Sequence, residues 1–352
     1  MPSKTNLLIS AVAGCGKTTR IVRDGCNCDS KRILFTTYTI NNTEAIREKI
    51  EEITGTIPKN ITVQTWFSFL LENWVRPYAN TFPGVNCVEG MSFSEGRSAK
   101  YIPKNIPEHY LADNNTIYSD KLSMFGLECN KKNGGLNISR LEEVYDQIII
   151  DEVQDLSGYD LDLLSLLIHS KISIMMVGDP HQRIFETNES PYKKRESENI
   201  IRWLKSEYKS SIEYEEMSNS FRCSKAICEF VNKLYPEMNM VSNNEKSDLD
   251  GIFYIRGMDE LKQHLEGKNV TVLGHNISSK PSLADISYMN MGASKGLSFD
   301  HVVIVVTEPI RNYLEKGTPI DKELSKRKFY VAITRARYSV AFYYPDKSKK
   351  KK

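Results

Sequence analysis

The sequence lacks long hydrophobic runs, paired cysteine motifs and a marked net charge. No apolar stretch approaches the roughly 18 residues of a membrane-spanning helix, so no membrane span is expected. The seven cysteines form no CxxC pair, and Cys26 and Cys28 make at most half of a zinc site. The odd cysteine count and the lack of a secretory leader indicate reduced thiols in a cytoplasm-like compartment.

The charge balance leaves the kind of partner open. Lys and Arg number 47 against 45 Asp and Glu, a formal charge of +2, and without the five lysines of residues 347–352 the chain carries −3. These last residues are interpreted as a solvated basic tail. A polyanionic partner is therefore neither favoured nor excluded, and it would have to bind in a local groove.

What the sequence has is an alternation of short apolar runs with helical segments. This pattern predicts an α/β fold with parallel sheets flanked by helices. From about 72 to 140 the pattern degrades among prolines and glycines, which indicates a small irregular insertion. We predict two domains, 1–210 and 211–346, followed by the tail. Strands are expected at 6–11, 31–37, 147–150, 172–177, 212–217, 251–255, 270–274, 301–306 and 338–344, and helices at 43–53, 63–71, 158–169, 199–208, 225–234, 259–265 and 322–332.

A phosphate-binding loop follows the first expected strand. The segment AVAGCGKT has P-loop spacing, with Ala11 in place of the first glycine. Its two glycines let backbone N–H groups approach phosphates, Lys17 neutralises the β- and γ-oxygens, and the Thr18 hydroxyl binds Mg²⁺. A chance glycine turn is the alternative, which the strand–loop–helix context disfavours. The expected nucleotide contacts are Ala13, Gly14, Cys15, Gly16, Lys17, Thr18 and Thr19.

Two carboxylates, Asp151 and Glu152, end the apolar strand at 148–150. Ligands bind at the carboxyl ends of strands in an open parallel sheet. Asp151 can hold Mg²⁺, and Glu152 can orient or deprotonate an attacking water. Together with the P-loop, this pair predicts a nucleoside triphosphatase that uses ATP and Mg²⁺.

Eight short segments occur in a recognisable order: AVAGCGKTT, TYTINNTEAIREKI, TWFSF, DEVQD, VGDPHQRIF, NSFRCSKAI, GASKGLSFD and YVAITRAR. This series resembles the superfamily 1 DNA helicases of the UvrD, Rep and PcrA kind, in a compact form with reduced accessory subdomains. The resemblance implies two RecA-like domains that share one ATP site. It does not extend to residues 72–140.

The resemblance also implies roles for residues outside the P-loop. Gln182 is expected to contact the γ-phosphate, and Arg222 and Arg335 are expected to act as arginine fingers from the second domain. Phe221 is expected to stack on the base of ATP, with burial in a core as its alternative. Gly296 is included among the nucleotide contacts because a glycine permits close backbone approach.

For the nucleic-acid track, Tyr38 matches an aromatic residue that stacks on a base in the family. Single strands are held by aromatic faces for bases and by short polar or basic groups for phosphates. Trp66 and Phe67 are expected in the core. The expected phosphate and strand contacts are Thr37, Thr65, Ser68, Ser294 and Lys295.

The sequence departs from the family pattern at several positions. No adenine-recognising glutamine segment precedes the P-loop; Ser298 replaces a glutamate that meets the ribose; Phe67 replaces a histidine; and Glu186–Thr187 stand where many members carry a DNA-stacking Trp. The missing glutamine segment leaves adenine specificity open.

Three functions follow from these observations. The first is an ATP-dependent translocase and helicase on single-stranded or tailed duplex DNA, 3′ to 5′ by resemblance, with replication or repair proteins as partners. The second is a DNA-stimulated ATPase subunit that does not unwind, or a motor that acts on RNA. The third, a non-enzymatic ATP switch, conflicts with the intact set of catalytic residues.

Overall fold

The computed structural model describes residues 5–28, 31–93, 96–185, 192–244, 251–267, 269–282 and 286–345. The tail at 347–352 and the departure at Glu186–Thr187 lie outside this part of the chain. The chain divides into two compact units. Unit 1 comprises Met1–Ser10, Lys17–Pro180 and Phe185–Glu216, and unit 2 comprises Ala11–Gly16, His181–Ile184 and Met217–Lys352.

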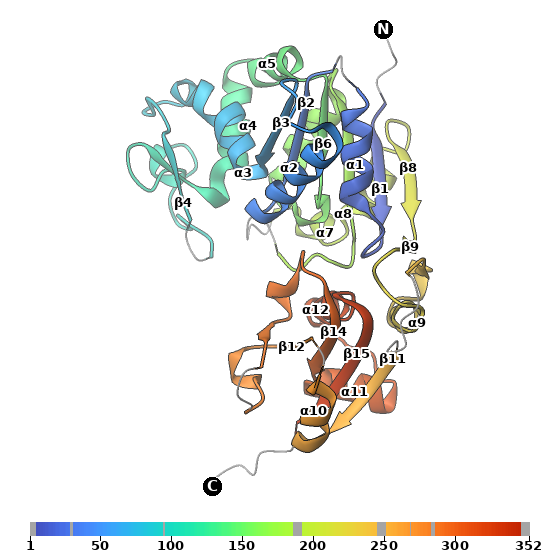
Figure 1. Cartoon of the computed structure of the whole chain (residues 1–352). Helices are drawn as coiled ribbons and strands as arrows, with labels where there is room; N and C mark the ends of the chain where they lie inside the picture. Colours follow the sequence, from blue (N-terminus) through green and yellow to red (C-terminus); the bar gives the residue numbers. More distant parts are fainter. Residues whose placement is uncertain are drawn as a thin grey trace. The chain divides into compact units, whose positions relative to one another are not determined.

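Unit 1 is built on a six-stranded sheet of order β3-β2-β6-β7-β1-β8 (Figure 1). The pairs β2·β3, β2·β6, β6·β7 and β1·β7 are parallel, so these strands end at the same edge. The expectation that the segment from 212 opens a second set of strands is wrong. β8 lies beside β1, and the Glu213 N–H donates to the Asn6 carbonyl at 2.8 Å. The strands are β1 (Leu7–Ala11), β2 (Ile33–Thr37), β3 (Ile61–Thr65), β6 (Gln147–Ile150), β7 (Ser173–Gly178) and β8 (Glu213–Met217).

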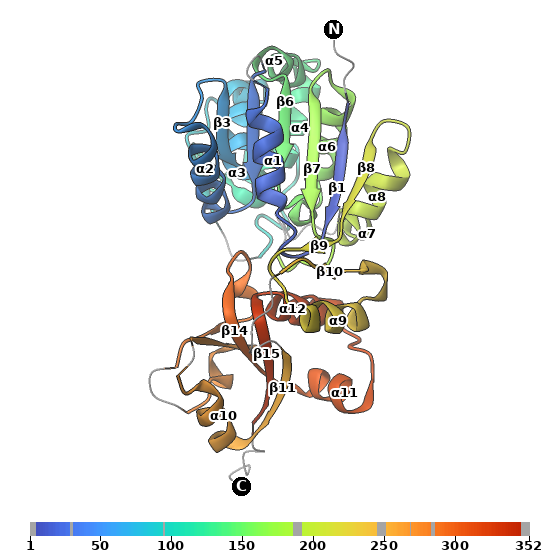
Figure 2. The same ribbon diagram turned by 45° about the vertical axis from the view of Figure 1, so that its right-hand side comes forward.

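Helices cover both faces of this sheet (Figure 2), because each central strand is apolar on both sides. On one face, a Cβ on Gly25 of α1 would lie 2.5 Å from the Phe35 ring, so glycine lets this helix approach the sheet closely. Leu34 and Ile148 point to the opposite face and join the large core there. The helices of the first face are α1 (Lys17–Cys26) and α2 (Ile40–Thr54).

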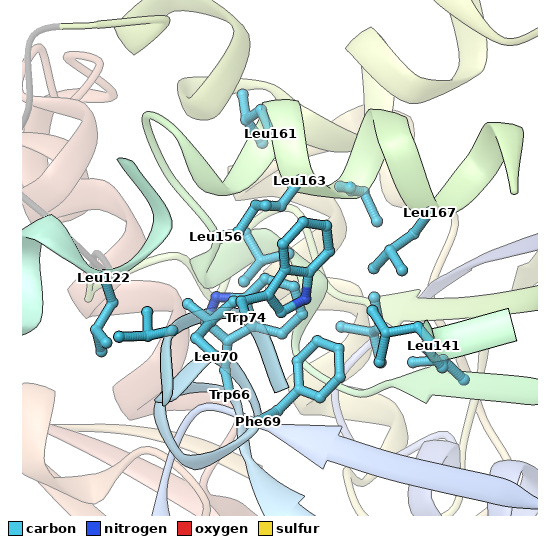
Figure 3. Close-up of a cluster of buried hydrophobic side chains, with 14 of the residues drawn as sticks. Trp66, Phe69, Leu70, Trp74, Leu122, Leu141, Leu156, Leu161, Leu163 and Leu167 are labelled. Carbon is cyan, nitrogen blue, oxygen red and sulfur yellow. The ribbon is translucent and has the colours of Figure 1, made fainter. Parts of the chain in front are cut away.

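The main core of unit 1 gathers tryptophan, phenylalanine and leucine side chains between helices and the sheet (Figure 3). Trp66 is fully buried, which confirms its assignment to the core, and its indole N–H donates to Asp160 at 2.9 Å. This core continues into the insertion without a break. The helices around it are α3 (Trp66–Phe69), the π-helical turn η1 (Leu70–Val75), α4 (Leu122–Lys132), α5 (Leu136–Val144), α6 (Asp160–His169), α7 (Lys194–Glu198) and α8 (Ile200–Glu207).

The insertion is more regular than its sequence indicates. α4 lies within it, and α5 begins in it. Gly126 of α4 allows close packing, because a Cβ there would lie 3.1 Å from the Trp74 Cβ. We call residues 72–140 the accessory lobe. It also contains β4 (Gly90–Ser92) paired in parallel with β5 (Thr116–Tyr118), and the 3₁₀ turns η2 (Arg76–Thr81), η3 (Pro107–His109) and η4 (Ser119–Lys121).

Unit 2 contains a five-stranded sheet of order β11-β15-β14-β12-β13, in which all four pairs are parallel. Leu261 of α10 joins the core on one face of this sheet. On the other face, Phe329 of α12 and Phe230 of α9 pack against Phe342 of the sheet. The elements are β9 (Asn219–Ser220), α9 (Lys225–Leu234), η6 (Pro236–Met238), β10 (Val241–Ser242), β11 (Gly251–Arg256), α10 (Gly257–Leu265), β12 (Val270–Gly274), η7 (Ile277–Ser279), β13 (Tyr288–Asn290), η8 (Gly292–Ser294), β14 (Phe299–Val305), α11 (Glu308–Lys316), α12 (Glu323–Ile333) and β15 (Ala336–Tyr344).

The predicted α/β class, with parallel sheets flanked by helices, is confirmed. The segment from 63 to 71 differs from its expected helix, because β3 runs to Thr65 before α3 begins. The sequence also missed α11 and β13. Among the described helices, none has the length and apolar character needed to cross a membrane.

Candidate nucleotide and nucleic-acid sites

The P-loop has the backbone that its glycines predict. It runs from the end of β1 to the start of α1 at Lys17, with φ of +73° at Gly14 and +82° at Gly16. A side chain at either position would be strained. The start of α1 carries the positive end of the helix dipole, which favours a phosphate.

The loop residues Ala11–Gly16 belong to unit 2, and other residues of that unit form hydrogen bonds with the first half of the loop. The Ser220 hydroxyl donates to the Ala13 carbonyl at 2.8 Å, and the Phe221 N–H donates to the Gly14 carbonyl at 2.9 Å. The Ala13 N–H donates to the Tyr330 hydroxyl at 3.3 Å. Ser220 and Tyr330 were not expected in the site, although both stand in the motif segments NSFRCSKAI and YVAITRAR.

Lys17 and Glu152 form an ion pair at the edge of the unit 1 sheet. Lys17 Nζ lies 3.1 Å from Glu152 Oε1, and both side chains are only 11% exposed. Glu152 has a φ of +57°, a left-handed conformation that is uncommon for residues other than glycine, Asn and Asp. Its backbone N–H donates to the buried Asp151 carboxylate at 2.9 Å. The structure thus brings together three of the predicted catalytic residues.

Gln154, which was not expected in the site, holds this arrangement in place. Its side-chain amide nitrogen donates to Glu152, and its Oε1 accepts the Asp179 N–H at 3.1 Å. A Cβ on Gly178 would lie 2.4 Å from Gln154 Oε1, so only glycine leaves room for this bond. Gln154 therefore links η5 (Val153–Asp155), after β6, to the end of β7.

The residues suit Mg²⁺ bound together with a nucleotide. In the described residues, no group of three or more His, Cys, Asp or Glu could hold a metal alone. Mg²⁺ usually keeps several waters and takes only one or two protein oxygens beside substrate phosphates. Thr18, at the start of α1, and Asp151, after β6, offer this small set.

The two predicted arginine fingers meet at Thr334 in unit 2. Arg222 donates to the Thr334 carbonyl at 3.3 Å, and Arg335 donates to the Thr334 hydroxyl at 3.4 Å. Arg335 is only 2% exposed and also donates to the Val331 and Leu297 carbonyls. Arg222 lies against the P-loop, since a Cβ on Gly14 would be 2.4 Å from its Cβ. Arg222 is therefore the arginine brought to the phosphate loop.

The other predicted nucleotide contacts differ in their exposure to solvent. Phe221 is 61% exposed, so its alternative placement in a core is wrong and its ring is open to a ligand. Gln182 is buried, next to His181, whose ring lies 3.9 Å from that of Tyr235. Gly296 is exposed, with a φ of +87°.

Two predicted nucleic-acid contacts need correction. Thr37 is buried and its hydroxyl accepts a hydrogen bond from Asn42, so it presents no surface hydroxyl. Ser294 is buried and its hydroxyl donates to the Met291 carbonyl at 2.7 Å. Because both hydroxyls are buried, neither can contact the phosphates of a bound nucleic-acid strand.

The remaining predicted contacts stay partly accessible. Thr65 caps α3 by accepting the Ser68 N–H at 3.1 Å. Tyr38 and Lys295 are half-buried, as is Phe67, which packs against the edge of the core.

Comparisons with known proteins show the family to which the chain belongs. The family described as a viral superfamily 1 RNA helicase core domain matches residues 134–344, and the family described as an AAA domain matches residues 2–188. Each match covers more than half of the chain. The chain therefore belongs to the superfamily 1 helicases, a class of enzymes that hydrolyse nucleoside triphosphates. No curated protein sequence matches it.

The first of three solved structures shows a similar fold. The arterivirus nonstructural protein 10 helicase is 14% identical with a TM-score of 0.51, over 96% of this chain and 59% of that one. The same protein in complex with DNA is 13% identical with a TM-score of 0.49, over 97% of this chain and 62% of that one. The PRRSV helicase is 12% identical with a TM-score of 0.47, over 98% of this chain and 53% of that one. This chain thus spans about three fifths of the length of the first structure.

Proposed function

We propose that the protein is an ATP-driven translocase on single-stranded nucleic acid that unwinds duplexes. One observation carries this proposal: the Lys17–Glu152 pair and Tyr38 lie at the same edge of one sheet, after β1, β6 and β2. A single rigid sheet then positions both the hydrolytic group and a base-stacking ring. The units correspond in this proposal to two RecA-like domains.

In the proposed reaction, Lys17 exchanges its carboxylate partner for the phosphate oxygens of ATP. Glu152, released from Lys17 and still held by Gln154, orients the attacking water and accepts its proton. Thr18 and Asp151 would hold Mg²⁺, which when bound would neutralise negative charge on the phosphates of the nucleotide. Gln182, Arg222 and Arg335 respond to the γ-phosphate and the transition state, and Phe221 stacks on the base.

We keep DNA as the track and 3′ to 5′ as the direction, on the eight ordered segments that resemble UvrD, Rep and PcrA. These segments also support roles in DNA replication or repair. RNA is the second candidate, favoured by the match to a viral RNA helicase core over residues 134–344. That match also supports a viral protein acting in a host cell.

The test is ATP hydrolysis with single-stranded DNA, single-stranded RNA or duplex DNA, followed by strand displacement on 3′- and 5′-tailed duplexes. We expect single strands to stimulate hydrolysis and 3′-tailed DNA to be displaced. If single strands stimulate ATP hydrolysis but no strand is displaced, the protein is the ATPase that does not unwind. Displacement of 5′-tailed duplexes alone would overturn the direction, and stimulation by RNA alone would overturn the choice of DNA.

A further inference from the structure

Four aromatic rings from separate segments of unit 1 lie in contact with one another. We call Phe185, Tyr38, Phe67 and Phe93 the aromatic row. Tyr38 lies 6.4 Å from Phe185 in a stacked arrangement and 5.7 Å from Phe67, measured between ring centroids. Phe67 lies 5.7 Å from Phe93, nearly perpendicular to it at 88°. The row therefore runs from the motor sheet to the accessory lobe.

Both ends of the aromatic row are open to solvent. Phe93 is 70% exposed and Phe185 is 39% exposed. A single exposed apolar side chain needs no explanation, but a continuous row of rings on a surface indicates a binding site. Phe93 directly follows β4, so the lobe places this ring beside the predicted strand-binding residues after β2 and β3.

The charge of the segment that follows Phe93 in the sequence favours a polyanionic ligand. From 96 to 106 the lobe carries Arg97, Lys100 and Lys104 and no carboxylate. Lys100 and Lys104 are exposed. Burial lowers the pKa of His109 most, and Lys121, Lys104 and Arg97 lower it further, so these three cations act on one histidine of the lobe. Aromatic rings beside cations are the usual means of holding an unpaired strand.

We infer that Phe93 binds an unpaired base of the translocated strand and that the accessory lobe is therefore part of the nucleic-acid track. The occupant is a nucleic acid base because the row continues from Tyr38, the ring already assigned to base stacking, into a cationic segment. Stacking on a ring face accepts any base, as a moving motor requires. This inference rests on the proposed function, because it needs a single strand on the edge beyond β2 and β3.

The experiment compares Phe93→Ala, Phe93→Leu and Phe93→Trp in the full chain. Binding of a fluorescein-labelled single-stranded oligonucleotide is followed by anisotropy, and stacking by the fluorescence of a 2-aminopurine base in the strand. Tyr101→Ala is the matched control, since this ring is in the same lobe and 97% exposed but has no described contact with the row. Basal ATP hydrolysis without nucleic acid is measured for every variant.

We expect Phe93→Ala to weaken binding by about 5- to 100-fold and to restore 2-aminopurine fluorescence. Phe93→Leu should resemble Phe93→Ala, because leucine keeps apolar area without a π-face, and Phe93→Trp should bind at least as tightly as the wild type. Basal hydrolysis and Tyr101→Ala should remain unchanged.

Equal affinity of Phe93→Ala and the wild type would overturn the inference while leaving the proposed function intact. Equal losses in Phe93→Ala and Tyr101→Ala would also overturn it, since the effect would then be general to the lobe surface. Failure of the wild type to bind any single strand would instead overturn the proposed function itself.

Discussion

Replacing Glu152 by Gln separates two roles of this carboxylate: its observed ion pair with Lys17 and its proposed activation of the attacking water. Glutamine keeps the shape but has one acceptor oxygen where Glu152 uses two, so it can accept from only one of Lys17 and Gln154, and it carries no charge and is a poor base. In the present geometry Glu152 holds Lys17 at 3.1 Å and would also activate the water. The substitution should therefore slow hydrolysis while making Lys17 easier to transfer to ATP.

The magnitudes follow from the geometry and from general acid–base catalysis. At 3.1 Å and an effective dielectric constant of about 20, the attraction between Lys17 and Glu152 is about 5 kcal/mol before desolvation is counted. Desolvation offsets much of this for a pair that is 11% exposed. If about 1.4 kcal/mol remains as competition with ATP, removing it tightens ATP binding about tenfold. Loss of the base should lower kcat by roughly 10² to 10⁴.

The assay is steady-state ATP hydrolysis with saturating single strand, together with ATP affinity from a fluorescent analogue. Glu48→Gln is the control, because Glu48 is an exposed carboxylate on α2. We expect Glu152→Gln to bind ATP more tightly and to turn over at least 100-fold more slowly. Unchanged kcat, or ATP binding weakened tenfold, would refute the roles given to Glu152.

Two further predictions concern stability. Gly14→Ala should lower the free energy of unfolding more than Gly16→Ala, by about 1 to 3 kcal/mol of difference, in denaturant titrations without nucleotide. Both sites have positive φ, but only at Gly14 would the new Cβ meet Arg222, at 2.4 Å; equal losses would contradict this contact. Stability should also fall as pH rises from about 9 to 12. Burial raises the pKa of Cys129 to about 11 and that of Tyr214 to about 12, from 9.0 and 10.0, so the unfolded chain loses these protons first. Tyr214→Phe should flatten this fall in titrations at pH 8 and 10.5, and an unchanged slope would contradict the assignment.

The regular parts of the fold were predictable because their signals are local. β6 and β12 are apolar runs of strand length, and their observed bounds match the expected ones. α9 was likewise predicted from its residue pattern alone. α4 was missed because the prolines and glycines scattered through residues 72–140 obscured its pattern, although α4 packs closely against Trp74 at Gly126.

The candidate site was predictable only where a residue acts within its own motif. Lys17 and Glu152 were named from spacing, and the structure pairs them. The roles of Gln154 and Tyr330 depend on partners 25 and 317 residues away, which no local pattern contains. The burial of Thr37 and Ser294 is likewise decided by packing, so their hydroxyl chemistry misled the prediction.

The most direct test of the central claim is ATP hydrolysis by the wild type and by Lys17→Ala, each with and without a single-stranded oligonucleotide. A translocase of this kind should hydrolyse ATP faster when the strand is present, and Lys17→Ala should lose both the basal and the stimulated rates. Hydrolysis that no single strand stimulates, or that persists in Lys17→Ala, would contradict the account.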